Sequence, residues 1–512
     1  MLNTSPRAKL HGPARLAPLG RYLLAVGATV GLLVTSALPV NAAPPPHHHY
    51  KLIVLGTLGG PNNEGSESGT GNYLINNRGM VTGSADTLVP DPFPPFCFFV
   101  PDCLVAHVFR WQDGVLTDLG ALAPGVSSGV SQINAAGWIA GQSQNGLIDP
   151  LTGVPEIRAV LWKEDQIIDL GTLGGNESTA TTLNNAGQVV GAAANTIPDP
   201  LSLFGFGTQT RAFLWQNGEM QDLGTLGGPD AAALAVNASG QVAGFSYTDA
   251  TPTPVTGLPT THPFLWENGS MIDLGTLGGT FGGPSFLLVG ADSNVYLNNR
   301  GQVVGASTLA GDLIFHPFLW DHGLLTDLGT LGGDNGSPSW INDAGDVVGE
   351  ADLPGSVVHH GFLWRNGVMT DLGALASTSF AASINSRGQI VGRSRIGAVT
   401  NPVQHAFLWE NGGPMIDLNT VIPANLGVLL GEACCINDRG EIAGLGFLPN
   451  GEMRTFLLIP CDENHPDIEG CDYSLVDAAP AVQRPAAANQ SHQVSKELLR
   501  KLSARRFGLR RP

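Results

Sequence analysis

The stretch from Thr181 to Gly224 decides the fold, and it reads TTLNNAGQVVGAAANTIPDPLSLFGFGTQTRAFLWQNGEMQDLG. Three short phrases follow one another in it: Asn-x-x-Gly at 184–187, Phe-Leu-Trp at 213–215 and Asp-Leu-Gly at 222–224. The first phrase occurs eight times, at intervals of 43 to 61 residues, with its Asn at Asn76, Asn134, Asn184, Asn237, Asn298, Asn342, Asn385 and Asn437. A fixed order of phrases at such a period indicates a repeat architecture.

Each repeat predicts two β-hairpins. Asn184 can cap a turn with its side chain, and Gly187 accepts the left-handed conformation that a type I turn with a G1 bulge requires. Asn217-Gly218, between β-rich runs, predicts a two-residue type I′ turn. Four antiparallel strands in one repeat, repeated eight times, predict an all-β fold: a β-propeller of eight four-stranded blades.

The two ends of residues 50–460 predict how the ring closes. Tyr50–Gly60 resembles the fourth strand of a repeat without the third, and Arg454–Ile459 resembles a third strand without the fourth. Pairing these two segments would complete the last blade and remove exposed sheet edges. Seven blades with an extra hairpin is the alternative, because the unit around Asn76 carries the largest insertion.

The segments outside the repeats predict export. Residues 1–42 have the layout of a signal peptide: basic residues, an apolar stretch from Tyr22 to Leu38, and small residues that favour cleavage after Ala42. An uncleaved membrane anchor is the alternative. Residues 43–49 are interpreted as a linker, and 461–512 as a Cys-containing turn followed by a disordered basic tail. The expected location is secreted, extracellular or at the cell surface, with no membrane span after cleavage.

Export permits disulfides, and all six cysteines follow the signal segment. Short loops favour the pairs Cys97–Cys103 and Cys461–Cys471. The neighbours Cys434 and Cys435 then remain, as a strained vicinal bridge or as buried thiols, and we favour the bridge.

Charge excludes one class of partner. Residues 50–460 hold 13 Lys and Arg against 36 Asp and Glu. Nucleic acid is not expected as a partner, because phosphates need a basic face. The sequence holds no recognised nucleophile motif, P-loop or zinc-protease motif. We therefore predict no catalytic, cofactor-binding or metal-binding residues and no cofactor.

A cationic or imidazole side chain recurs at the start of each third strand. The positions are His107, Arg158, Arg211, His262, His316, His360, His405 and Arg454. Diagonal pairing predicts contacts with the Asp of the neighbouring fourth strand, at Asp118, Asp169, Asp222, Asp273, Asp327, Asp371 and Asp417. The eighth partner position holds Val54. Because one pair recurs, we interpret it as structural rather than catalytic.

Three linked motifs carry a family resemblance. They are His405-Ala406-Phe407-Leu408-Trp409, Asp-Leu-Gly-Thr-Leu-Gly-Gly (as at 169–175 and 222–228), and Ile/Leu-Asn-x-x-Gly-Gln-Val-Val-Gly. The chain resembles the HAF family of bacterial extracellular repeats over about residues 52–459. This resemblance implies an exported bacterial protein and carries over no catalytic residue. Arg replaces His in three repeats, and the last repeat ends without Trp.

Length varies most between the second and third strands, at 86–105, 145–157, 196–210 and 248–261. Variable loops on a rigid scaffold favour recognition. The sequence thus predicts a monomeric binding scaffold for an extracellular protein or glycan. A carbohydrate-active or other propeller enzyme is the alternative. The pair Cys434-Cys435 is similar to the vicinal disulfide of quinone-dependent alcohol dehydrogenases, but their characteristic blade motif is missing.

Overall fold

The computed structural model describes residues 49–64, 74–94, 96–97, 103–164, 166–284, 294–397, 403–423, 426–462, 464–466, 468 and 471. The predicted signal peptide, most of the linker and the basic tail lie outside these residues. Strands dominate the described part, together with one 3-10 turn, η2 (Leu418–Thr420). The prediction of an all-β fold is confirmed.

The strands follow the repeats in order. Repeats one to four hold β2 (Asn63–Glu64), β3 (Val81–Pro90), β4 (Leu104–Gln112), β5 (Val115–Asp118), β6 (Ser128–Ile133), β7 (Ile139–Ile148), β8 (Pro155–Lys163), β9 (Gln166–Asp169), β10 (Ser178–Leu183), β11 (Val189–Pro198), β12 (Thr208–Gln216), β13 (Glu219–Asp222), β14 (Ala231–Val236), β15 (Val242–Pro252), β16 (Pro259–Glu267) and β17 (Ser270–Asp273).

Repeats five to eight continue the pattern. They hold β18 (Gly278–Gly283), β19 (Tyr296–Leu297), β20 (Val303–Leu309), β21 (Phe315–Asp321), β22 (Leu324–Asp327), β23 (Gly336–Ile341), β24 (Val347–Asp352), β25 (His359–Arg365), β26 (Val368–Asp371), β27 (Ser379–Ile384), β28 (Ile390–Ile396), β29 (Val403–Trp409), β30 (Ile416–Asp417), β31 (Leu429–Ile436), β32 (Ile442–Phe447) and β33 (Met453–Pro460), with β1 (Tyr50–Val54) completing the last sheet.

The sheets have the topology of a β-propeller. The four strands of a repeat lie side by side in chain order, and the first strand of a repeat packs against the second strand of the repeat before it. A single parallel bridge, Thr261 to Phe281, joins repeats four and five into one nine-stranded sheet. Hydrogen bonding therefore gives seven sheets for eight repeats, and the number of blades stays a prediction.

The predicted registers are confirmed in the third repeat. Phe213 pairs with Asp222 and Trp215 pairs with Met220. Asn217 and Gly218 have φ angles of 53° and 89°, as a type I′ turn requires. Phe213 and Trp215 are both buried, because the middle strands pack against neighbours on both faces.

The second glycine after each phrase asparagine, such as Gly191 in Gln188-Val189-Val190-Gly191, has a packing reason. A Cβ on Gly191 would collide with the carbonyl oxygen of Thr179 on the first strand and with the ring of Phe213 on the third. The first strand bulges beside it, between Ala180 and Thr182. Only glycine lets the two backbones approach this closely.

The eight phrase asparagines form a closed circle of hydrogen bonds. The Asn184 side-chain oxygen caps its own turn by accepting from the backbone N–H groups of Ala186 and Gln188, as predicted. Its Nδ2 donates to the carbonyl oxygen of Asn237 in the next repeat, at 2.9 Å. All eight repeats make this contact, and Asn437 donates back to Asn76 at 2.9 Å, so the circle has no end.

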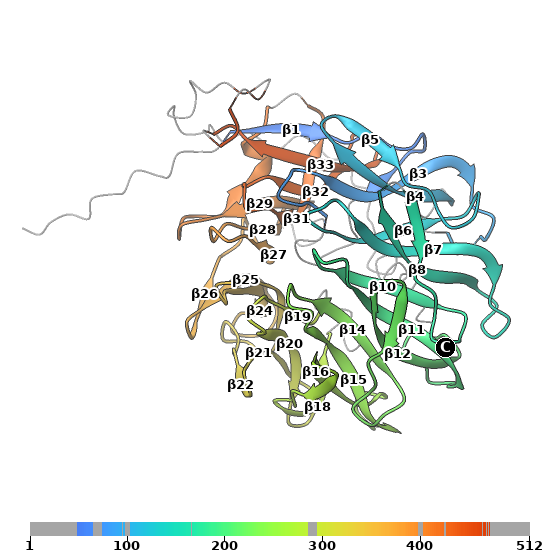
Figure 1. The fold of residues 1–512 in the computed structure, drawn as a ribbon. Helices are drawn as coiled ribbons and strands as arrows, with labels where there is room; N and C mark the ends of the chain where they lie inside the picture. The colour runs from blue at the N-terminus through green and yellow to red at the C-terminus, as the bar shows by residue number, and fades with distance from the viewer. Residues whose placement is uncertain are drawn as a thin grey trace, which may run out of the picture. The chain divides into compact units, whose positions relative to one another are not determined.

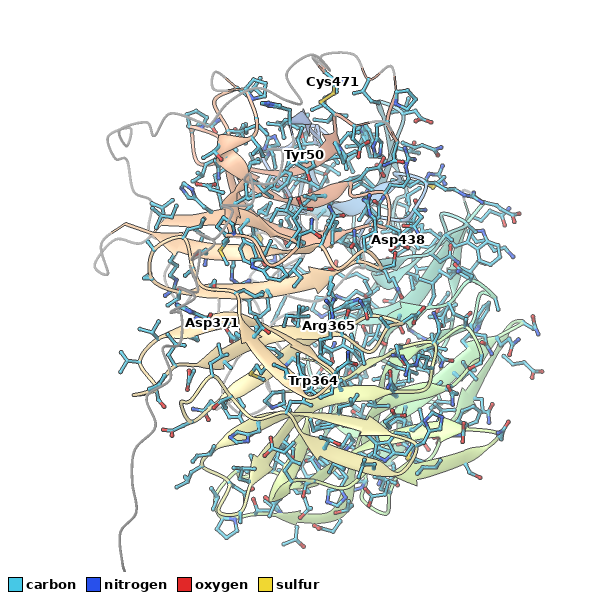
Figure 2. All side chains as sticks on the ribbon, turned by 90° about the vertical axis from the view of Figure 1, so that its left-hand side faces the viewer. Tyr50, Trp364, Arg365, Asp371, Asp438 and Cys471 are labelled. Atoms are coloured by element: carbon cyan, nitrogen blue, oxygen red, sulfur yellow. A yellow bond between two sulfur atoms is a disulfide. The ribbon has the colours of Figure 1, made fainter. Side chains whose placement is uncertain are left out.

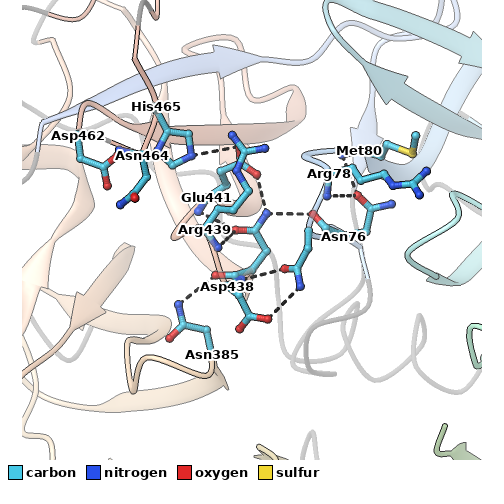
Figure 3. Close-up of polar contacts among 12 residues, drawn as sticks. Asn76, Arg78, Met80, Asn385, Asp438, Arg439, Glu441, Asp462, Asn464 and His465 are labelled. Carbon is cyan, nitrogen blue, oxygen red and sulfur yellow. Dashed lines mark hydrogen bonds and ion pairs between the residues drawn. The ribbon is translucent and has the colours of Figure 1, made fainter.

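The ring closes where the two ends of the repeat region meet. β1 pairs antiparallel with β33 over five residues, from Tyr50 opposite Pro460 to Val54 opposite Phe456 (Figure 1), which confirms the predicted closure. At the same seam, Asp438 and Asn77 exchange backbone and side-chain hydrogen bonds (Figure 3).

A C-terminal segment packs on this seam. The His465 side chain is fully buried, with Nδ1 2.7 Å from Asp462 and Nε2 3.4 Å from the Glu441 carboxylate (Figure 3). The disulfide Cys461–Cys471 closes the loop that carries His465. The pairs Cys97–Cys103 and Cys434–Cys435 are also formed, so all three predicted disulfides are confirmed.

Candidate functional site: the four ribbons

The second strands of the first four repeats extend beyond the packed sheets. β3, β7, β11 and β15 have 10 or 11 residues, and their last three or four residues are exposed. The matching strands β20, β24, β28 and β32 have six or seven residues. The described parts of the long connections in repeats one to four therefore extend as β-ribbons, at 87–94 with 96–97 and 103–104, at 145–156, at 195–209 and at 248–260, which we call the four ribbons.

A bulge marks the base of each ribbon. The pairing with the third strand shifts between Asp86 and Pro90 in the first ribbon, and at the matching place in the other three. Such bulges increase strand twist and re-aim the residues beyond them. The tips are then fixed by Asp91, Asp149 and Asp199, whose Oδ1 atoms each accept from the N–H two residues further on, at 2.8 Å.

The ribbons expose large apolar side chains. The exposed fractions are 75% for Leu88, 58% for Leu147, 52% for Ile197, 58% for Leu201 and 56% for Val255. These side chains come from four consecutive repeats. Large exposed apolar side chains on neighbouring repeats make this face a candidate interaction surface. The sequence pattern predicted the variable loops but not their exposed apolar residues. A sequence signal for them was present: an apolar residue shortly before Asp-Pro, in Leu147-Ile148-Asp149-Pro150 and in Ile197-Pro198-Asp199-Pro200.

A buried carboxyl lies beneath the second ribbon. Glu177 Oε2 accepts the N–H of Ile157 at 2.9 Å, while its Oε1 and the Oδ2 of Asp149 are buried with no hydrogen-bond partner in the described part of the chain. Burial raises the pKa of Glu177 to about 8, and the nearby Asp149 and Glu156 add to the increase. The carboxyl of Glu177 is therefore protonated at neutral pH.

The third ribbon has an equivalent carboxyl. Asp230 accepts the N–H groups of Leu203 in the ribbon and Thr210 at the start of the third strand, both at 2.7 Å. Burial raises the pKa of Asp230 to about 7, and Asp199 contributes to the increase. Glu177 and Asp230 thus join the bases of the second and third ribbons to the following repeat, through carboxyls whose pKa values are raised toward neutral pH.

The recurring His–Asp pairs are formed as predicted in five repeats. The Nδ1 to carboxylate distances lie between 2.7 and 3.0 Å, for His107–Asp118, His262–Asp273, His316–Asp327, His360–Asp371 and His405–Asp417. Burial alone would raise the pKa of Asp118, but hydrogen bonds from His107 and the N–H of Gly120 hold it below its usual value. A pair repeated in five repeats with the same geometry fits the structural interpretation.

The arginine repeats differ among themselves. Arg211 contacts Asp222 at 3.1 Å as predicted. The predicted pair Arg158–Asp169 is wrong: Arg158 lies 3.8 Å from Glu156 instead, because this acid on its own strand offers a competing carboxylate. Arg454, whose diagonal position across the seam holds Val54 and no Asp, pairs with Glu452 at 2.6 Å.

Two searches of the described residues bear on other site types. Over these residues, no three His, Cys, Asp or Glu side chains are grouped so that they could hold a metal ion. Within the same part of the chain, no helix is long and apolar enough to cross a membrane.

Comparison with known proteins finds likeness only in structure. No family model and no curated protein matches the sequence. A putative gluconolactonase is similar at 10% identity and a TM-score of 0.25, over 59% of this chain and 81% of its own. Porphyromonas gingivalis dipeptidyl peptidase 4 is similar at 9% identity and a TM-score of 0.43, over 81% of this chain and 63% of its own. TolB from Acinetobacter baumannii is similar at 10% identity and a TM-score of 0.30, over 80% of this chain and 96% of its own.

Proposed function

We propose that this protein is an exported binding scaffold that holds an extracellular partner on the apolar tips of the four ribbons. One observation carries the proposal: Leu88, Leu147, Ile197 and Val255 are each more than half exposed, and they lie on four consecutive repeats. Exposing them costs solvation free energy of about 1.5 to 3 kcal/mol per side chain relative to burial, which a bound partner would recover.

The construction of the ribbons supports this proposal. Bulges, Asp-capped tips and buried acids beneath them hold the apolar side chains in place before a partner arrives. Pre-organised contacts lower the entropy lost on binding. Export is part of the proposal through the signal-like residues 1–42 and the resemblance to HAF repeats, and three disulfides are compatible with an oxidising compartment.

The test is binding to an array of extracellular proteins and glycans, with the domain from residue 43 onward. A double variant, Leu147→Ser with Ile197→Ser, should lose at least ten-fold in affinity for any partner found. Leu324→Ser with Val115→Ser is the matched control, because both residues are at least as exposed but lie beside the turns between third and fourth strands. Equal affinity of the two double variants would contradict the proposal.

A further inference from the structure

The seventh repeat departs from the others at one turn. His360 and Asp371 in the sixth repeat are 11 residues apart, as are the other His–Asp pairs, whereas His405 and Asp417 are 12 apart. The turn reads Asn411-Gly412-Gly413-Pro414 where the other repeats have two turn residues. The added residue and a proline, which cannot donate to a ladder, disrupt the hairpin.

The consequence is a shortened outer strand. β30 has two residues, whereas β26 has four. Trp364 in the sixth repeat pairs with Met369 across the hairpin. The ladder between β29 and β30 stops at Leu408 opposite Ile416, so Trp409 has no residue opposite it on β30, although it pairs with Ile390 on β28.

This missing pairing leaves a groove between the sixth and seventh repeats. It measures about 680 Å³, within the usual range for a small-molecule site. Leu363, Val368, Thr370 and Asp371 line one wall, and Trp409 and Gly412 line the other. Figure 2 labels Arg365 and Asp371, which lie on the sheet of the sixth repeat.

The ionised groups of the groove already have partners. Arg365 binds Asp346 in a two-pronged ion pair, with Nε–Oδ1 at 2.8 Å and Nη2–Oδ2 at 2.7 Å. Asp371 accepts from His360 and from the N–H of Gly373. The charges of Arg365 and Asp371 are therefore already balanced, so a charged ligand would gain little net attraction from them, whereas a neutral ligand needs no counter-charge.

Apart from these ionised groups, the groove is lined by an indole, aliphatic side chains, a hydroxyl, an amide and glycine backbone. Val368, which is 63% exposed, offers most of the apolar area, with a small part from Trp409, which is 8% exposed and lies in the same core cluster as the buried Leu363. Thr370 and Asn366 offer neutral hydrogen-bonding groups. A pyranose ring has apolar C–H faces and neutral hydroxyls in one molecule. We propose that the groove between repeats six and seven binds a short, uncharged oligosaccharide. This inference does not depend on the four ribbons.

The experiment uses the chain from residue 43 onward and trisaccharides and tetrasaccharides of glucose, mannose, galactose and xylose, titrated by calorimetry. At least one should bind in the micromolar to millimolar range. Thr370→Trp fills the groove and should weaken that binding at least ten-fold. Gln221→Trp is the matched control, because Gln221 occupies the same strand position in the third repeat, away from the groove.

A second variant guards against misfolding of the first. Deleting Gly413 shortens the turn by the extra residue and should also weaken binding at least ten-fold, with an unchanged circular dichroism spectrum. Leu147→Ser with Ile197→Ser should leave saccharide affinity unchanged, which separates this site from the ribbon face. The proposal is overturned if no neutral saccharide binds, if binding survives both groove variants, or if the groove prefers sulfated sugars or an extended peptide.

Discussion

Replacing Glu177 by Gln should remove a large pH dependence of folding stability. Glu177 is 3% exposed, and its pKa is raised to about 8 from an ordinary value of 4.5. Glutamine has the shape of the protonated acid. Its Oε1 can still accept the N–H of Ile157, so the substitution keeps this contact and removes only the titration.

The sign follows from the direction of the shift. Between pH 4.5 and 8 the folded state holds a proton that the unfolded state has lost. Stability therefore falls as pH rises through this window, by up to about 1.4 kcal/mol per pH unit. Over the whole window the loss from this one carboxyl is on the order of 5 kcal/mol, because burial penalises the charged form.

Urea unfolding of the disulfide-bonded protein at pH 5, 6, 7, 8 and 9 measures the effect. The free energy of unfolding of Glu177→Gln should decline less with pH than that of the wild type, and the two curves should separate most at pH 9. Glu219→Gln, at an exposed turn position, serves as the control and should follow the wild type. Parallel wild-type and Glu177→Gln curves from pH 5 to 9 would refute the reasoning.

Three further outcomes are expected. Asn237→Ala removes one member of the asparagine circle and the cap of its turn, and should lower the free energy of unfolding in urea by about 2 kcal/mol. Thr225→Ala, at an exposed turn, should change it far less. Deleting residues 50–54 leaves an edge of β33 unpaired, and light scattering should show self-association that the full ring lacks. Burial alone would raise the pKa of Asp417, but His405 lowers it, so the stability that Asp417 contributes is lost as pH falls. Asp417→Asn should therefore make the melting temperature depend less on pH in the acid range. An unchanged pH dependence would count against the pairing.

The repeat fold was predictable because its signals are local. Asn217-Gly218 dictates a type I′ turn, and that turn sets the pairing of Phe213 with Asp222. The complementary half-repeats at the two ends predicted the pairing of β1 with β33. The short spacings of the cysteines predicted the disulfides for the same reason: residues close in sequence have few other partners.

The candidate sites were less predictable because they depend on neighbouring repeats. Glu177 is an ordinary glutamate in the sequence, and only its position under the second ribbon, near Asp149 and Glu156, raises its pKa. Arg158 contacts the carboxylate of Glu156 on its own strand and not the expected Asp169. The one-residue insertion at Gly412-Gly413-Pro414 is visible in the sequence, but the groove beside it needs the wall contributed by the sixth repeat.

By itself, the sequence determined the strands, the hairpin registers and the closing pair, since turn type and side-chain alternation act over a few residues. The tertiary structure alone decided that eight Asn side chains complete a circle, that Leu88, Leu147, Ile197 and Val255 remain in solvent, and that Trp409 lies beside a groove. Burial and solvent exposure are properties of packed neighbours, and in a ring those neighbours come from repeats 43 to 61 residues away.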